Sequence, residues 1–285
     1  MKSDEVHGTA APILELVDVT YRYGNGRAAL DGVSFAIGEG RKTAIVGANG
    51  AGKSTAIFHM NGLYRATSGE VRFKGIPLDA ARRERMTDHV GVVFQDPDDQ
   101  IVSLTVREDV AFGLAQRRLP REEIERRTGA YLELLGIGRL IDANPNDLSY
   151  GQRKTVAIAG VLALETEVVV FDEPMAFLDP TGKKELQRIM NRLAASGKTV
   201  IVTTHDMQLV AEWADDVVVM KDGRCLGAMS PNELFANREL LRETKLELPP
   251  IAELASALWP GDPTAMPIRL EALKRWLLDE RQGGG

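Results

Sequence analysis

Cysteine, long apolar runs and an excess of positive charge are all absent from this sequence, or nearly so. The only cysteine is Cys225, which excludes an internal disulfide and a cysteine-cluster metal site and is typical of a reducing compartment. The longest apolar run, Ala157–Leu164, is well short of the roughly 18 residues that a membrane helix needs. Residues 1–12 are polar, so we expect no secretory signal there. These absences predict a cytosolic protein and leave docking on a membrane protein open.

Acidic residues outnumber basic ones. The 285 residues include 35 Lys and Arg against 41 Asp and Glu, a formal net charge of −6, which argues against broad nucleic-acid binding. Hydrophobic residues make up 44% and charged residues 27% of the chain, as is ordinary for a globular protein. The length allows one large domain or two small ones. We therefore expect a globular protein without a nucleic-acid partner.

The order of apolar runs and turn signals predicts an α/β fold. Short strands are expected at Leu14–Tyr23, Val33–Ile37, Lys42–Val46 and Gly69–Phe73. From about residue 104 to residue 164 the pattern is helical. Two apolar strands, Val168–Phe171 and Thr199–Thr204, then flank a helix near 182–195. This strand–helix–strand order predicts right-handed parallel crossovers, and residues 217–224 predict a closing hairpin.

The composition changes after residue 247, where prolines divide the chain into short pieces. Residues 268–280 then predict a helix with one apolar face, formed by Leu270, Leu273, Trp276 and Leu277. Two interpretations of this helix stay open, namely packing on its own domain and contact with a second copy. The three glycines 283–285 are expected to form a flexible tail or to be a cloning remnant.

A glycine-rich loop follows the apolar run Lys42–Val46 and precedes a predicted helix over 54–63. It fits G-x-x-x-x-G-K-[ST], the Walker A pattern, in which backbone N–H groups, a lysine and the helix N-terminus bind phosphate and the hydroxyl binds Mg²⁺. A plain glycine-rich turn would not explain the strand before the loop and the helix after it. The predicted nucleotide-binding residues are Gly47, Asn49, Gly50, Ala51, Gly52, Lys53, Ser54 and Thr55, with Ser54 also predicted at Mg²⁺.

Two carboxylates, Asp172 and Glu173, end the apolar strand Val168–Phe171. Open α/β sheets bind ligands at the carboxyl ends of their strands, although two acidic residues can also simply end a strand. The segment resembles a Walker B strand with an additional glutamate. That resemblance implies that Asp172 holds Mg²⁺ through its water shell and that Glu173 is the general base for the attacking water.

The narrowest indication comes from Leu148-Ser149-Tyr150-Gly151-Gln152. This run resembles the signature motif of the ATP-binding cassette (ABC) family, and the resemblance covers about residues 13–235 with every motif in the family's order. In that family the helix after the motif points at the γ-phosphate held by the opposite subunit. The resemblance implies that Ser149, Gly151 and Gln152 complete the ATP site of a second subunit. Ser149 also lies where a helix cap is expected.

Further residues match other motifs of the ABC family. Tyr23 lies where the family stacks an aromatic ring on adenine, with a core tyrosine as the alternative. Gln95 matches the Q-loop glutamine, which touches Mg²⁺ or water and hinges toward the transport partner. Asp179 matches the D-loop, which crosses to the other subunit. His205 matches the catalytic switch histidine at the γ-phosphate, although a histidine at a strand end is often structural.

The sequence departs from the family pattern in two places. Tyr150 replaces the first glycine of the usual Leu-Ser-Gly-Gly-Gln, and residues 175–177, Met-Ala-Phe, replace the usual small polar residues before the D-loop. Gly151, whose backbone must approach phosphate, is retained. We therefore expect ATPase activity, with the bulky Phe177 as an open question for the D-loop.

The Q-loop sequence Phe94–Gln100 resembles that of energy-coupling factor (ECF) ATPases, as does the Leu-Ser-Tyr-Gly-Gln-Arg-Lys form of the signature. The likeness is greatest to the cobalt/nickel-type ATPase, which works as a homodimer. It implies ATP and Mg²⁺ as cofactors, and a second copy, a transmembrane T-component and a substrate-binding membrane S-component as partners. It also implies a peripheral position on the cytoplasmic face of the membrane, with the cargo held by the S-component.

The same resemblance implies the fold and the domains. We expect an α/β ABC ATPase, a P-loop NTPase with a mixed sheet core, an antiparallel β subdomain and an α-helical signature subdomain. The ATPase domain is predicted at 13–245, with its helical subdomain at about 97–164, and a small C-terminal helical extension at 246–285.

Other functions remain open on the sequence alone. An ECF vitamin importer is one alternative. The ATPase of another importer, for example for amino acids, is a second, and the acidic run 96–100 argues against it. A soluble ABC protein of translation or DNA repair would need tandem cassettes or a long coiled-coil insertion, and neither is visible. A P-loop kinase or GTPase would leave Leu148–Gln152 unexplained.

Overall fold

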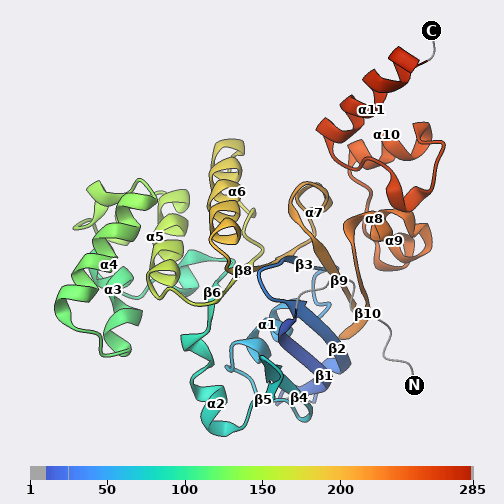
Figure 1. Cartoon of the computed structure of the whole chain (residues 1–285). Coiled ribbons are helices and arrows are strands. Elements are labelled where there is room, and N and C mark those ends of the chain that lie inside the picture. The colour runs from blue at the N-terminus through green and yellow to red at the C-terminus, as the bar shows by residue number, and fades with distance from the viewer. Residues whose placement is uncertain (1–10, 25, 284–285) are drawn as a thin grey trace. The chain divides into compact units, whose positions relative to one another are not determined.

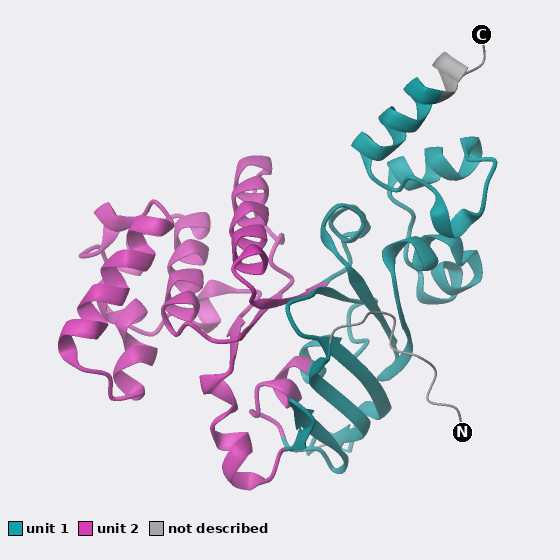
Figure 2. Ribbon diagram, in the orientation of Figure 1, with its two compact units in different colours: residues 1–56, 65–77, 204–285 teal, residues 57–64, 78–203 magenta. Residues whose placement is uncertain are grey.

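The computed structural model describes residues 11–24 and 26–283 (Figure 1). His7, most of the polar segment 1–12 and the last two glycines of the predicted tail lie outside these residues. The chain forms two compact units (Figure 2). The first unit comprises residues 1–56, 65–77 and 204–285, and the second comprises residues 57–64 and 78–203. None of the helices within the described residues is long and apolar enough to cross a membrane.

The first unit contains an antiparallel sheet of order β2-β1-β4-β5, formed by Ala28–Gly38, Pro12–Arg22, Ser68–Phe73 and Ile76–Pro77. Leu16 of β1 lies opposite Phe35 of β2 and Val71 of β4, and all three are buried. The predicted strands are confirmed, but β2 begins five residues before the predicted Val33. Its first half pairs with β1 across register shifts, and such bulges disturb the alternation of apolar residues on which the prediction rests.

A second set of strands in the first unit is mixed. β3 (Lys42–Val46) pairs in parallel with β9 (Asp216–Lys221), which pairs in antiparallel with β10 (Arg224–Met229). The residues from Ala44 to Val46 are at most 1% exposed, which explains a continuous apolar run rather than an alternating one. Asp222 and Gly223, both at positive φ, make the predicted hairpin turn. Together with the antiparallel sheet, these strands confirm the predicted fold class.

The second unit contains three parallel strands, β6 (Val90–Val93), β7 (Val168–Asp172) and β8 (Thr199–Thr204). The helix α6 (Pro180–Ala195) connects β7 to β8, so the predicted strand–helix–strand order is confirmed. All residues of β6, β7 and β8 are buried. Their carboxyl ends therefore lie on one edge of the sheet, where Val93 and Asp172 end their strands.

The predicted helical segment consists of α3 (Val106–Gln116), α4 (Arg121–Leu134) and α5 (Tyr150–Ala163). These helices share a buried apolar cluster that includes Val110, Leu132 and Val156, and Figure 1 draws them in green. The second unit also contains α2 (Ala80–Glu84), and α1 (Lys53–Met60) follows the glycine-rich loop. Short 3₁₀ turns occupy Met86–Asp88, Pro97–Asp99, Gly138–Leu140, Pro145–Asp147 and Pro263–Ala265.

Helices complete the first unit, namely α7 (Met207–Trp213), α8 (Pro231–Ala236), α9 (Arg238–Thr244), α10 (Pro250–Leu258) and α11 (Leu270–Gly283). On the predicted apolar face of α11, Leu273 is buried and the ring of Trp276 lies edge-on to that of Trp259, with centroids 5.3 Å apart. Leu270 and Leu277 are 43% and 36% exposed. The helix therefore packs on its own unit through only part of its apolar face, and its other predicted role stays open.

Candidate functional site

The glycine-rich loop between β3 and α1 has a backbone that only glycine fits. Gly47 has φ of +152°, and a Cβ there would lie 2.2 Å from the carbonyl oxygen of Met220. Gly52 has φ of +100°, and its Cβ would lie 2.7 Å from the carbonyl oxygen of Ala29. Side chains at these positions would displace the backbone. The glycines of the motif thus shape the loop itself, independently of any ligand.

Lys53 is held within this loop. It is 6% exposed, and its Nζ donates hydrogen bonds to the carbonyl oxygens of Gly47 at 2.7 Å and Ala48 at 3.3 Å. The first i→i−4 bond of α1 runs from Ala56 N–H to the Gly52 oxygen at 2.9 Å, so the helix N-terminus lies at the end of the loop. A buried ammonium group and a helix N-terminus together favour an anion.

Tyr23 lies at the end of β1, in the same unit as the loop. Its hydroxyl shares a hydrogen bond of 2.8 Å with Oγ1 of Thr55, and its ring lies edge-on to Tyr21 with centroids 5.4 Å apart. The side chain is half-buried, which fits a ring with an accessible face better than the alternative of a core tyrosine. The bond to Thr55 connects Tyr23 to the first turn of α1.

In the second unit, Asp172 and Glu173 lie at the end of β7 and are 8% and 9% exposed. The hydroxyl of Thr203, on the neighbouring strand β8, donates to Oδ1 of Asp172 and accepts the N–H of Glu173 at 3.0 Å. Glu173 has φ of +42°, a conformation that non-glycine residues adopt mostly where function requires it. Sequence reasoning missed Thr203, although its place in the Thr-Thr-His run that ends β8 was a usable signal.

His205 follows β8 and belongs to the first unit. The residue is exposed, and its role at the γ-phosphate stays a prediction. The next residue, Asp206, caps α7 by accepting the N–H groups of Gln208 and Leu209 at 3.0 and 3.1 Å. His59, which matches no motif, is buried, and His89 lies 3.0 Å from a Glu167 oxygen.

The signature helix α5 begins with a complete capping box. Oγ of Ser149 accepts the Gln152 N–H at 3.3 Å, and Oε1 of Gln152 accepts the Ser149 N–H at 2.9 Å. The cap that was predicted at Ser149 is confirmed, and Gln152, which was predicted only at the nucleotide, also completes this cap. Apart from the adjoining residues and the backbone of its own helix, no described atom lies within 4 Å of a Cβ added at Gly151. Packing within the described chain therefore does not require glycine there, whereas close approach of a ligand would.

The two departures from the family pattern contact each other. The ring of Tyr150 lies edge-on to that of Phe177, with centroids 5.6 Å apart. Phe177 has φ of +60° and is 79% exposed, so the chain keeps a large exposed ring in an unfavourable backbone conformation. Two residues later, Asp179 caps α6 by accepting the Gly182 N–H at 2.7 Å. The D-loop residue is thus also a helix cap.

Gln95 is exposed at the start of the Q-loop, and its backbone carbonyl accepts a hydrogen bond of 2.6 Å from Nζ of Lys154. Lys154, on α5, is 1% exposed. Burial lowers the pKa of its ammonium group to about 8. The negative charges of Asp172 and Asp96 act in the other direction and raise this pKa, but they do not outweigh the burial. Sequence reasoning missed Lys154 because a lysine within a helix usually indicates a solvated face.

The oxygen donors present in each unit have the chemistry that Mg²⁺ prefers. The second unit offers the Asp172 carboxylate, fixed by the Thr203 hydroxyl, and the Gln95 amide, and the first unit offers the Ser54 hydroxyl. Carboxylate, amide and hydroxyl oxygens are hard ligands that suit Mg²⁺. The residues present therefore fit the ion that the sequence predicts.

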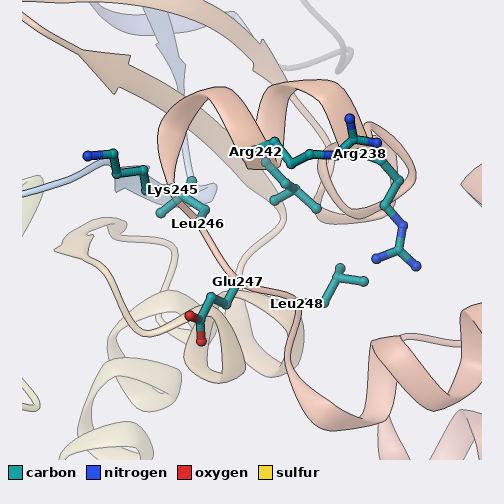
Figure 3. Close-up of a pocket in the computed structure, with 7 residues that line it drawn as sticks. Arg238, Arg242, Lys245, Leu246, Glu247 and Leu248 are labelled. Atoms are coloured by element: carbon teal, nitrogen blue, oxygen red, sulfur yellow. The ribbon is translucent and has the colours of Figure 1, made fainter.

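A separate pocket of about 520 Å³ lies beside α9 in the first unit (Figure 3). It is lined by Arg238, Leu241, Arg242, Lys245, Leu246, Glu247 and Leu248. None of the residues predicted to act on the nucleotide lines it. The pocket is therefore distinct from the residues that carry the motifs.

Comparison with known proteins points in the same direction as the motifs. Residues 30–176 match the family model described as ABC transporter. The chain is 46% identical over 241 residues to the energy-coupling factor transporter ATP-binding protein EcfA of Carboxydothermus hydrogenoformans, covering 85% of this chain and 89% of the relative. It is 44% identical over 248 residues to the EcfA of Methanocaldococcus jannaschii, covering 86% and 89%.

Solved structures are similar as well. The structure of cbiO1 from Clostridium perfringens, described as part of the ABC transporter complex cbiONQ, is 40% identical with a TM-score of 0.73 and covers 86% of this chain and 99% of that one. A dimeric ATP-binding cassette in a post-hydrolysis state, bound to ADP and Pi, is 30% identical with a TM-score of 0.69 and covers 76% and 98%.

Proposed function

This chain belongs to the ABC transporter family as an energy-coupling factor ATP-binding subunit, and we propose that it drives uptake of a cobalt or nickel ion. Members of the family are ATPases, and hydrolysis of ATP to ADP and phosphate is the activity of the chain. In this proposal, two identical copies form the ATPase on the cytoplasmic face of a membrane. They dock there on a transmembrane T-component and on an S-component.

The phosphate loop binds the nucleotide of its own chain. Lys53 would leave the carbonyl oxygens of Gly47 and Ala48 to bind the β and γ phosphates, while the loop N–H groups from Asn49 to Thr55 bind the same oxygens. Tyr23 would stack on adenine. Ser54, Gln95 and Asp172 would hold Mg²⁺, which neutralises the phosphate charge that develops during transfer.

The hydrolytic step needs a base and a group at the γ-phosphate. Glu173 accepts a proton from the attacking water, and the Thr203 hydroxyl keeps its backbone N–H in place. His205, exposed at the end of β8, contacts the γ-phosphate. These roles rest on the match to the family's motifs, and the burial of the carboxylate and the exposure of the histidine support them.

The observation that carries the shared-site proposal is the N-terminus of α5. Ser149 and Gln152 fix the start of this helix, and Gly151 is free of any packing that would require glycine within the described residues. A ligand approaching the Gly151 N–H explains both features. The similar solved cassette is a dimer bound to ADP and Pi, which supports a second copy as the source of that ligand, with Asp179 at the same interface.

Two observations support a metal-ion cargo. The Q-loop and signature sequences resemble those of the cobalt/nickel-type ATPase, and the similar cbiO1 structure is described as part of a cbiONQ complex. The names of the curated relatives give no cargo, so an ECF vitamin importer is the second candidate. Because cargo would bind to the S-component, the residues of this chain do not discriminate between the two.

Uptake by the complete transporter tests the cargo directly. The chain would be co-expressed with the T-component and S-component proposed as its partners, in cells that lack their own cobalt and nickel uptake. We expect accumulation of radioactive Co²⁺ or Ni²⁺ that a Glu173→Gln variant abolishes. ATP-dependent accumulation of a vitamin such as riboflavin or biotin, with no metal uptake, would contradict the metal proposal and leave the ATPase assignment standing.

A further inference from the structure

The backbone of the Q-loop is fastened to the signature helix α5. Lys154 Nζ donates to the carbonyl oxygens of Phe94 at 2.8 Å and Gln95 at 2.6 Å. The Tyr150 hydroxyl donates to the same Gln95 oxygen at 3.2 Å. Two side chains one helical turn apart therefore hold a single carbonyl group, because positions i and i+4 lie on one face of a helix.

Other bonds tie the rest of the loop to the same helix. Gln100 accepts the Phe94 N–H at 2.9 Å through Oε1 and donates to the Ala157 oxygen of α5 at 3.3 Å through Nε2. Arg153 forms an ion pair of 2.8 Å with Asp98. The strand β6 ends at Val93, immediately before the first fastened residue. Bending of the chain at this point would therefore occur before Phe94 and not within the loop.

Tyr150 extends the connection to a third segment. Its ring contacts that of Phe177, in the turn between Glu173 and the capped helix α6. Phe177 has few other contacts to hold it, since 79% of its surface is exposed. The edge-on geometry is one that aromatic pairs favour. A glycine at position 150, as in the usual motif, would provide neither the ring nor the hydroxyl.

We propose that Tyr150 and Lys154 are positioning residues that make the Q-loop, the signature helix and the turn after Glu173 move together as one rigid body. Lys154 and the Tyr150 hydroxyl fix the Gln95 backbone, and the Tyr150 ring fixes the turn through Phe177. Movement of the Q-loop is then transmitted to the signature helix and to the turn beside the base. The inference rests on the proposed function, in which Gln95 and Ser149 act on ATP.

Kinetics of the purified full-length protein test the role of each part. Tyr150→Phe keeps the ring and removes only the hydroxyl, so we expect kcat to fall about fivefold, the factor of one hydrogen bond. KM for ATP should stay unchanged because the phosphate loop is untouched. Phe177→Leu should lower kcat about threefold through loss of the ring pair, and the conservative Phe177→Tyr should restore it.

The matched control is Tyr131→Phe. Its hydroxyl also donates a hydrogen bond within the same unit, to Oε1 of Glu165 at 3.2 Å. This bond is not one of those that hold the Q-loop. We expect wild-type kcat and KM. An equal loss in Tyr131→Phe and Tyr150→Phe would assign the effect to general destabilisation and overturn the proposal, as would a wild-type kcat in Tyr150→Phe.

Hydrogen exchange provides a readout that needs no ATPase activity. The amides of Phe94, Gln100 and Ile101 are hydrogen-bonded within the loop, so their exchange reports opening of that loop. In Tyr150→Phe and in Lys154→Met we expect peptides covering 94–101 to exchange about fivefold faster or more, with α4 peptides unchanged. Unaltered exchange in both variants would overturn the fastening.

The proposed function and the positioning role can be contradicted independently of each other. A wild-type protein without ATPase activity would contradict the proposed function, while faster loop exchange in the variants would still support the fastening. An active wild type with unchanged variants would contradict the positioning role alone.

Discussion

At the scale of single residues, Thr203 shows how one short side chain can fix two neighbouring acidic residues. Its hydroxyl donates to Asp172 and accepts the N–H of Glu173, so the carboxylate predicted at Mg²⁺ and the predicted base are fixed through one oxygen atom. Glu173 is kept at φ of +42°, and the fold maintains that conformation at a position where most residues would be strained.

Replacement of Glu173 by glutamine removes the base and keeps the size of the side chain. We expect kcat to fall about a thousandfold, as for loss of a general base, while ATP binding persists and an ATP-bound dimer accumulates. Phosphate release and size-exclusion chromatography with ATP measure the two effects. Glu167→Gln, at the opposite end of β7, should behave as wild type. Undiminished hydrolysis in Glu173→Gln would place the base elsewhere.

Replacement of Tyr23 by alanine removes the ring proposed to stack on adenine. We expect KM for ATP to rise about tenfold, since stacking on a base is worth about 1–3 kcal/mol, with a smaller change in kcat. Tyr23→Phe keeps the ring and loses only the bond to Thr55, so its KM should stay near that of wild type. An unchanged KM in Tyr23→Ala would mean that adenine stacks on another group.

At the scale of elements, α5 combines features that were predictable with features that were not. Its N-terminus at Ser149 follows from a serine with a glutamine three residues later, which is a local signal. β3 and β7 were equally predictable, because buried parallel strands are continuous apolar runs. The bonds of Tyr150 and Lys154 to Gln95 join residues 55 and 59 positions apart, and such pairing has no local signal. The same holds for the contact between Tyr150 and Phe177.

Burial of Lys154 in α5 makes the stability of the protein depend on pH in a defined direction. The pKa of the folded protein's Lys154 is about 8, against 10.5 for the ordinary side chain. Between these values the unfolded chain binds more protons than the folded chain, so the free energy of unfolding rises with pH from about pH 8 to 10.5. Well below pH 8, Lys154 is protonated in both states, and its burial then lowers the free energy of unfolding by its full amount.

Denaturant unfolding at pH 7.5 and 9.5 measures this contribution. From pH 7.5 to 9.5, we expect the free energy of unfolding to rise in the wild type by on the order of 2 kcal/mol more than in Lys154→Met. Lys184→Met, which removes a lysine at an exposed position of α6, is the control and should keep the wild-type change. Equal changes in wild type and Lys154→Met would show that Lys154 stays protonated throughout.

At the scale of the whole molecule, the chain carries the parts predicted for an ATP site, and in our proposal a second copy completes that site. The phosphate loop and Tyr23 belong to the first unit, and the capped N-terminus of α5 belongs to the second. The resemblance to ABC ATPases predicts that the N-terminus of α5 contacts the ATP bound by a second copy. The similar solved cassettes are dimers, which supports this prediction. The domain boundaries at residues 245 and 246 stay a prediction. The cargo was not predictable from residues, because the proposed specificity resides on another polypeptide.

Complementation between two inactive variants tests the shared site most directly. Lys53→Ala disables the phosphate loop of a chain, and Ser149→Ala disables the signature that the chain offers to its partner. Random pairing makes half of the dimers mixed, and each mixed dimer has one of its two sites intact. We expect an equal mixture to recover roughly a quarter of wild-type ATPase activity, where each variant alone has almost none.

The control mixes a chain carrying both substitutions with either single variant, because neither mixture contains an intact site. The account predicts activity in the mixture of Lys53→Ala with Ser149→Ala and none in these controls. ATPase activity in that mixture no higher than the sum of the two variants measured alone, with subunit exchange confirmed by labelled chains, would contradict a site shared between two copies.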